Sequence, residues 1–512
     1  MHPTRSLASV LLLAALGTLP SRAADITWNN AAGGSWNTAG NWNPNTVPLD
    51  AAGNSIFFGD NSGAFTSPLT VSVDAANTLG GASISFSGAA NYTIASSAVS
   101  TNFLRMSGTT QQITSSGTGT HQITARTNAG SRFGSAAFTV TNNSTGSLTF
   151  GDIIRVLGDS VTRTHTLTFG GSGNVVVNAI APADANQFFT STIVKSGTGT
   201  LTFRSTTLTG ATNGIRIDQG RISFGLSAAT FSTSISGDGG VLHSQDGRVT
   251  LTGANTYKGG TRIEGVGRVL AINNDGNLGD VSGAVTFGAG SPVLRVEGSG
   301  NFSTARNFVT ETGVSGVLAM GATAGRTATF SGAVSGAGNL VFGAGSSLGG
   351  VSGTYIFSGA GTHSGDTQIF STADGANKAT LELSDTGSLS FKIGASGVNN
   401  KVSGVPGGGT GANAPTASFA GTFNFDLSGA STTPGSSWTI VDFATLNPLT
   451  SFTSTFQVAG FSQANDIWSN GVYQFSEATG ILSVAAIPEP ASMAVLAGGF
   501  AFAGAALRRR RR

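Results

Sequence analysis

Short alternating apolar and polar runs, separated by Gly-rich turns, recur along this chain and constrain its fold more than any other feature. The stretch LTGANTYKGGT at residues 251–261 returns as FSGAGTHSGDT at residues 357–367, and a shorter version lies at residues 208–214. Since side chains two positions apart share one face of a strand, each unit has one apolar face. No part of residues 24–486 keeps a 3.6-residue apolar period, so we expect strands throughout.

Such a unit cannot bury its apolar face alone, but it can do so by stacking on its neighbours. We therefore predict an all-β fold, a right-handed parallel β-helix with terminal β caps, whose successive coils pair about 4.8 Å apart. Glycine, at 76 of 512 residues, suits the corners where the backbone needs positive φ. One apolar helix is expected at the C-terminus.

Changes of composition predict the domain boundaries. We expect an N-terminal β cap with the first coils at residues 24–135 and the repeat solenoid at residues 136–403. A Gly-rich linker should follow at residues 404–416, and a C-terminal β module at residues 417–486.

Composition excludes several classes of function. The chain has no cysteine, so disulfides, thiolate metal sites and a cysteine nucleophile are impossible. Charged residues are only 10% of the chain. Five of the 26 basic residues form the terminal run and two more precede residue 24, so the body is mildly acidic and nucleic acid is not expected as a partner.

Residues 1–23 have the pattern of a secretory signal peptide. Arg5 supplies the charged start, residues 7–19 form an apolar run, and Ala23 ends a Ser-Arg-Ala cleavage site. The alternative is a buried N-terminal helix. We favour export by Sec-type machinery, with cleavage after Ala23.

The other end has three parts in a fixed order. Pro488, Glu489 and Pro490 precede an uncharged apolar run at residues 491–507, which is just long enough for a transmembrane helix. The chain then closes on a basic cytoplasmic stop made of Arg508, Arg509, Arg510, Arg511 and Arg512. A generic tail anchor is the alternative.

This order resembles the PEP-CTERM sorting signal of Gram-negative bacteria, over residues 487–512. The resemblance implies an exosortase as partner, transient anchoring in the inner membrane, and release at the cell surface or outside the cell. It also implies an association with extracellular polysaccharide.

The repeat itself resembles the autotransporter-associated β-strand repeat. The likeness is close at residues 247–279 and looser at residues 197–225 and 338–384. It implies a β-helical passenger region of an exported bacterial surface protein.

Three of the five tryptophans, Trp28, Trp36 and Trp42, lie near the predicted mature N-terminus. Open solenoid ends need covering, so we interpret these residues as a cap. Stacking of a sugar ring on them is the alternative. Trp438 and Trp468 lie near the other end.

No constellation of catalytic or metal-binding residues is visible, so we expect no enzyme activity, cofactor or metal. Acidic residues that a glycosidase or lyase could use are scattered singly, at Asp218, Glu264, Glu297, Asp366 and Glu382. The histidines are isolated too, at His121, His165, His243 and His363. Residues 273–277 (NNDGN) faintly resemble a Ca²⁺ loop, but the later bidentate Glu is missing, so a turn is predicted.

These observations predict an exported structural or adhesive β-solenoid at the cell surface or in the matrix. The alternative is a carbohydrate-active β-helix enzyme whose site is assembled across coils. Acidic residues clustered along one groove would favour the enzyme, and a bare Ser/Thr/Asn face would favour the structural role.

Overall fold

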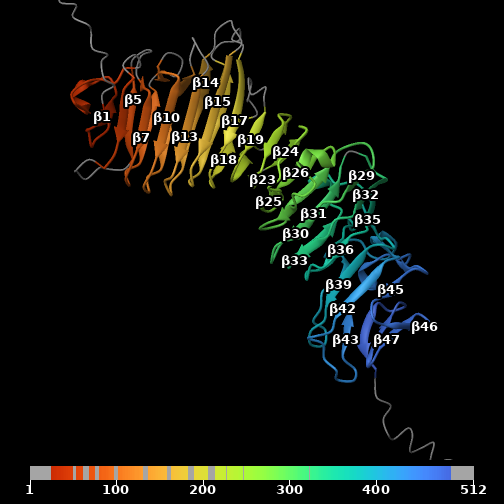
Figure 1. The fold of residues 1–512 in the computed structure, drawn as a ribbon. Helices are drawn as coiled ribbons and strands as arrows, with labels where there is room; N and C mark the ends of the chain where they lie inside the picture. The colour runs from red at the N-terminus through yellow and green to blue at the C-terminus, as the bar shows by residue number, and fades with distance from the viewer. Residues whose placement is uncertain are drawn as a thin grey trace, which may run out of the picture. The chain divides into compact units, whose positions relative to one another are not determined.

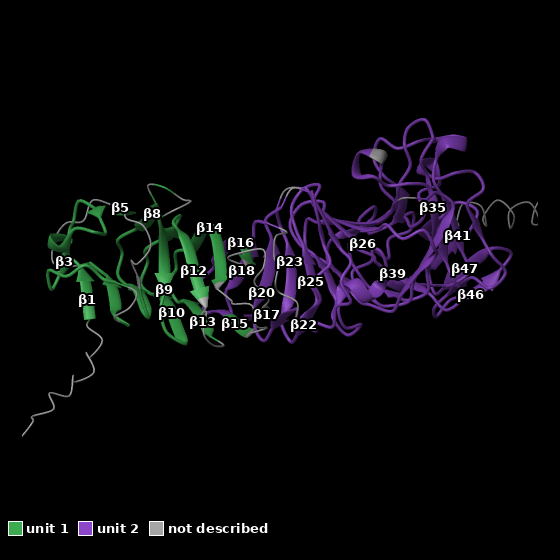
Figure 2. Ribbon diagram, turned by 90° about the horizontal axis from the view of Figure 1, so that it is seen from above, with its two compact units in different colours: residues 1–167, 180–189 green, residues 168–179, 190–512 purple. Residues whose placement is uncertain are grey.

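The computed structural model describes residues 25–485, except 50–52, 61–67, 75–79, 97, 99–101, 131–135, 158–162, 183–188, 206–213, 227, 246 and 322. The chain forms two compact units (Figure 2). The first unit comprises residues 1–167 and 180–189, and the second comprises residues 168–179 and 190–512. Strands β15 (Arg163–Gly170), β16 (Val175–Pro182) and β17 (Phe189–Lys195) contain residues of both.

The first unit is a stack of parallel strands (Figure 1). One row of strands is β1 (Asp25–Trp28), β4 (Ser55–Phe58), β7 (Ser83–Phe86), β10 (Thr110–Ser115) and β13 (Ala137–Asn142). A second row is β2 (Gly34–Ser35), β5 (Leu69–Val73), β8 (Tyr92–Ser96), β11 (His121–Ile123) and β14 (Leu148–Leu157). A third, β6 (Gly80–Gly81), β9 (Phe103–Met106) and β12 (Arg126–Gly130), also ends on β14.

The second unit contains three long parallel sheets. The β18–β45 sheet has the order β18 (Thr200–Phe203), β20 (Arg221–Phe224), β23 (Gly240–His243), β25 (Thr261–Ile263), β27 (Val285–Phe287), β30 (Phe308–Thr310), β33 (Val334–Gly336), β36 (Ala360–Gly361), β39 (Ser388–Lys392), β42 (Thr422–Asp426) and β45 (Gln457–Val458). The β21–β40 sheet has the order β21 (Ala228–Phe231), β24 (Arg248–Leu251), β26 (Val269–Ile272), β28 (Val293–Val296), β31 (Ser315–Met320), β34 (Asn339–Phe342), β37 (Thr367–Ile369) and β40 (Val402–Gly404). The β29–β44 sheet has the order β29 (Phe302–Thr304), β32 (Arg326–Phe330), β35 (Gly353–Phe357), β38 (Ala379–Leu383), β41 (Thr416–Phe419) and β44 (Ser451–Phe452). Strands β19 (Ile215–Ile217) and β22 (Ile235–Gly237) pair in parallel beside them.

Like residues stack on like residues because the coils are in register. Ile56, Ile84, Ile113 and Val140 are successive partners in the first unit, and all four are buried. Glycine sits where the stack leaves no room, as at Gly336, whose φ is +103° and where an added Cβ would collide with the carbonyl oxygen of Thr310. The predicted all-β, right-handed solenoid is confirmed.

The last part of the second unit changes its pairing. Strands β41, β42, β44 and β45 still continue the parallel sheets. An antiparallel sheet then has the order β43 (Ser437–Thr439), β49 (Ile481–Val484), β48 (Tyr473–Ser476), β47 (Ile467–Asn470) and β46 (Ser462–Ala464). The predicted linker at 404–416 contains the short 3₁₀ turn η5 (Gly411–Asn413) and leads directly into β41. The proposed domain boundaries stay predictions.

In the part of the chain that the structure describes, no helix has the length and apolar character needed to cross a bilayer. The predicted C-terminal helix, residues 491–507, lies outside the described residues.

Candidate functional site

A threonine face covers the outside of the β29–β44 sheet. Thr327, Thr354, Thr380 and Thr416 are successive partners on β32, β35, β38 and β41, and all are half-buried. The next outward row is Ser303, Thr329, Ile356, Glu382, Ser418 and Ser451. These two rows carry one charged side chain, that of Glu382. The face therefore offers mainly hydroxyl groups, spaced by the strand separation of about 4.8 Å.

The five acidic candidates do not come together into one site. Glu382 stands on the threonine face, whereas the side chains of three others form ion pairs with arginines. These pairs are Asp218 with Arg216 at 2.7 Å, Glu264 with Arg262 at 2.6 Å, and Glu297 with Arg295 at 3.1 Å. Asp218 is 44% exposed and fits a role as surface charge, whereas Glu264 and Glu297 are only 30% and 18% exposed.

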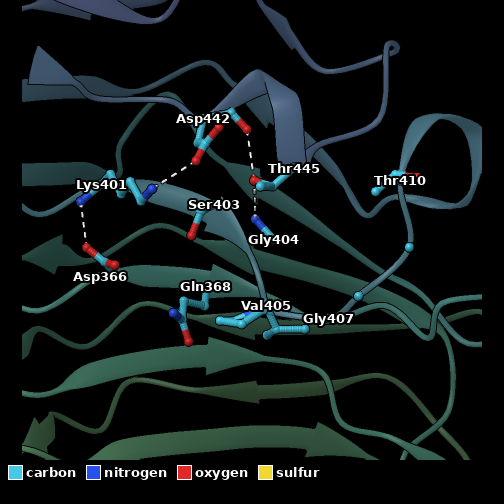
Figure 3. Close-up of a pocket in the computed structure, with 13 residues that line it drawn as sticks. Asp366, Gln368, Lys401, Ser403, Gly404, Val405, Gly407, Thr410, Asp442 and Thr445 are labelled. Atoms are coloured by element: carbon cyan, nitrogen blue, oxygen red, sulfur yellow. Dashed lines mark hydrogen bonds and ion pairs between the residues drawn. The ribbon is translucent and has the colours of Figure 1, made fainter.

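Two of the candidates line concave sites. Asp218 lines a cavity of about 520 Å³ with Asp238 and Arg221, and Asp366 lies in a site that we call the Lys401 groove (Figure 3). The groove has a volume of about 370 Å³, in the range of small-ligand sites. Its polar lining is Asp366, Gln368, Lys401, Ser403, Thr410, Asp442 and Thr445, and its other lining residues are Gly404, Val405, Pro406, Gly407, Gly408 and Gly409.

Lys401 contacts both carboxylates of the groove. Its Nζ lies 2.8 Å from Oδ2 of Asp442, and its backbone N–H donates to Oδ1 of Asp366 at 2.9 Å. Both bonds are drawn in Figure 3. On the other side of the groove, Thr445 Oγ1 accepts from the Gly404 N–H at 2.9 Å.

The strand register assembles this groove from three coils. Gln368 on β37 and Ser403 on β40 are direct partners, and an isolated parallel bridge joins Val402 to Val441. Asp442 follows that bridge and begins the 3₁₀ turn η6 (Phe443–Thr445). A second cavity of about 450 Å³ shares Asp366 and is also lined by Asn339, Ser364, Lys392, Asn399 and Asn400.

The tryptophans near residue 40 are completely buried. Trp28 and Trp42 pack edge to face with centroids 4.9 Å apart, and so do Trp36 and Trp42. Strand β3 (Trp42–Asn43) pairs antiparallel with β1 and closes the end of the stack. This supports the interpretation as a cap, and sugar stacking on these rings is ruled out because no ring face is exposed.

The predicted turn at residues 273–277 is confirmed. Oδ1 of Asn277 accepts from the backbone N–H of Asn273 at 3.0 Å and of Asn274 at 3.1 Å. Its amide also donates to the Gly253 carbonyl of the preceding coil at 2.9 Å. The turn begins the 3₁₀ segment η3 (Asp275–Leu278), which contacts a buried arginine, Arg306, that the sequence did not single out.

The histidines are buried and separate from one another. Burial lowers the pKa of His121 to about 4, although Asp60 acts in the opposite direction, and burial lowers the pKa of His363 to about 4. Nε2 of His363 lies 3.1 Å from Oγ1 of Thr367. No three His, Asp or Glu side chains group as metal ligands within the described residues.

We expect the stability of the protein to fall as the pH drops from 6.5 to 4. In this window an unfolded histidine with a pKa of 6.5 binds a proton, whereas folded His121 and His363 stay neutral. The loss is about 2 kcal/mol per histidine between pH 7 and pH 5, at 1.36 kcal/mol per pH unit. Urea midpoints across this range should decline, and His363→Gln should decline less steeply. A flat wild-type profile would contradict this account.

The predicted sorting and processing residues are not placed by the structure. Ala23, Pro488, Glu489, Pro490 and the run Arg508, Arg509, Arg510, Arg511 and Arg512 lie outside the described residues.

Comparison with known proteins gives a short similarity to part of the chain. No protein-family model matches the chain, and no solved structure does. The chain is similar to "Adhesin BmaC autotransporter" of Brucella suis biovar 1 (strain 1330), at 34% identity over 84 residues. These residues are 16% of this chain and 2% of the relative, so the chain spans a small fraction of that protein's length. The similarity and the solenoid are consistent with autotransporter-type repeats and with a surface or exported protein.

Proposed function

We propose that this chain is an exported structural or adhesive β-solenoid of the cell surface or extracellular matrix. The observation that carries the proposal is the threonine face, because rows of aligned hydroxyls can meet glycans or a neighbouring surface without desolvating charge. The partial similarity to a protein named as an adhesin supports it.

The route to the surface is the finer part of the proposal. Sec-type machinery exports the chain and removes residues 1–23. The segment 487–512 then anchors it transiently in the inner membrane, and an exosortase acts near Pro488, Glu489 and Pro490. The order of PEP motif, apolar run and arginine run in the sequence supports this route.

A carbohydrate-active enzyme is the second candidate, because the Lys401 groove holds two carboxylates. We propose that the groove is not catalytic, since Lys401 binds both Asp366 and Asp442. Incubation of the full chain with polysaccharides should release no reducing or unsaturated ends. Release that Asp442→Asn abolishes would establish the enzyme instead.

Deletion of the gene in the native host tests the adhesive role. We expect the deletion strain to lose surface attachment or cell aggregation, and the wild-type chain to restore it. A Thr354→Glu, Thr380→Glu double variant should restore much less, because it places charge on the threonine face. Thr312→Glu, in an exposed turn, is the matched control. Equal rescue by all three chains would contradict a role for this face.

A further inference from the structure

One outward row of side chains on the β21–β40 sheet changes from apolar to polar along the sheet. Successive partners in this row are Arg248, Val269, Val293, Val317, Val341, Gln368 and Ser403. The row begins at the half-exposed Arg248 side chain, which shows that it faces away from the solenoid interior. Its four valines nevertheless are buried in a separate apolar cluster.

The four valines are buried because other side chains cover this face of the sheet. Ala344 is buried in the cluster, and Leu348, Phe370 and Val405 pack against it. Val405 also lines the Lys401 groove, so the groove begins where this cover ends. The row becomes polar there, at Gln368 and Ser403.

Packing does not account for the two polar residues. Ser403 is only 4% exposed, but its hydroxyl is not among the enclosed polar atoms without a partner, and it lines the groove. Gln368 is half-buried, and it also lines the groove. Both line the groove, between the Lys401 ion pair and the glycine loop at Gly407 (Figure 3). Both side chains are therefore available for hydrogen bonds to a ligand or to water in the groove.

We propose that the Lys401 groove binds a neutral oligosaccharide, an inference that rests on the proposed surface function and gives it a ligand class. Each sugar hydroxyl both donates and accepts hydrogen bonds, and the groove offers both kinds of group. Asp366 and Asp442 accept, Lys401 donates, and Gln368, Ser403 and Thr410 do either.

Charge selects a neutral ligand. The groove and its adjoining cavity together contain Asp366, Asp442, Lys392 and Lys401, two charges of each sign. An acidic polysaccharide would approach both carboxylates, and it would compete with Asp442 for Lys401. Asp366 lines both cavities, and the proposed ligand extends from one to the other along the coils.

The groove lining contains no aromatic side chain, and Val405 and Pro406 are its apolar residues. Binding at one groove therefore depends on hydrogen bonds, which contribute modestly in water. Many copies of the chain at one surface would raise the effective affinity for a polymer.

Calorimetric titration of the full chain with cellohexaose, maltohexaose and mannohexaose tests the proposal, with hexagalacturonate as the acidic probe. We expect at least one neutral probe to bind and hexagalacturonate not to bind. A Gln368→Leu, Ser403→Ala double variant should bind at least tenfold more weakly. Thr312→Val, in an exposed turn away from both the groove and the threonine face, is the matched control and should bind like wild type.

Hydrogen exchange distinguishes a loss of binding in the double variant from a defect in its folding. The bound probe should protect the backbone amides of residues 399–410 in the wild-type chain, and the double variant should exchange like unliganded wild type elsewhere. The proposal is overturned if no neutral probe binds, if only hexagalacturonate binds, or if the double variant binds as tightly as wild type. If the protein is found at the cell surface but binds no neutral probe, only the proposal for the groove is overturned. If the protein is absent from the surface, the proposed function is overturned.

Discussion

Replacement of Arg306 by methionine is expected to lower the free energy of unfolding by about 3 to 5 kcal/mol. The Arg306 side chain is 1% exposed, and its Nε lies 3.0 Å from Oδ1 of Asp275. Its guanidinium also donates to the carbonyls of Asp280, of Gly283 at 2.9 Å and of Gly279 at 2.7 Å. Methionine fills similar space but leaves these acceptors in the second unit without a donor.

Arg216→Met is the matched control for this variant. Arg216 also forms an ion pair, with Asp218, but its side chain is 54% exposed, so the expected loss is below about 1 kcal/mol. Urea denaturation compares the two variants, and hydrogen exchange of residues 275–283 should rise in Arg306→Met alone. Equal stability of the two variants would show that the buried guanidinium does not hold this turn.

Phe58→Ala should destabilise the first unit by about 3 to 5 kcal/mol. The Phe58 ring lies under the N-terminal cap, with its centroid 6.2 Å from Trp28, 6.0 Å from Trp36 and 5.8 Å from Trp42. It also stacks on Phe86 of the next coil at 5.2 Å. Its removal leaves a cavity between the cap and the stack.

Phe57→Ala provides the comparison on the same strand. Phe57 points to the opposite face of β4 and is 36% exposed, whereas Phe58 is fully buried. Its truncation should cost about 1 kcal/mol or less. Three of the five tryptophans lie in the cap, so unfolding followed by tryptophan fluorescence reports mainly on it. Similar losses in the two variants would contradict the assignment of Phe58 and the tryptophans to one buried cluster.

The sequence predicted the architecture because its local signals agree with one another. Alternation in runs such as Val249 to Leu251 specifies strands, and the repeat indicates that they stack. The tryptophan cap could also be predicted from the sequence, because bulky apolar residues at the start of a solenoid are expected to cover its open end. No local signal identified Arg306, which is a single arginine between two strands. Its partners belong to the preceding coil, at residues 275–283.

The groove could not be predicted for a similar reason. Asp366 was one of the scattered acidic residues, but Lys401 lies 35 positions after it and Asp442 another 41 positions after Lys401. Only the register of three coils brings them together, and irregular coil lengths conceal that register in the sequence. The row of outward valines was also missed, because a buried outer face looks like an ordinary inner face in an alternating pattern.

Intact mass and cellular location of the chain expressed in its native host test the central claim of export to the surface most directly. We predict a product outside the cell that starts at residue 24 and ends near Pro488. An unprocessed chain retained in the cytoplasm would contradict the claim.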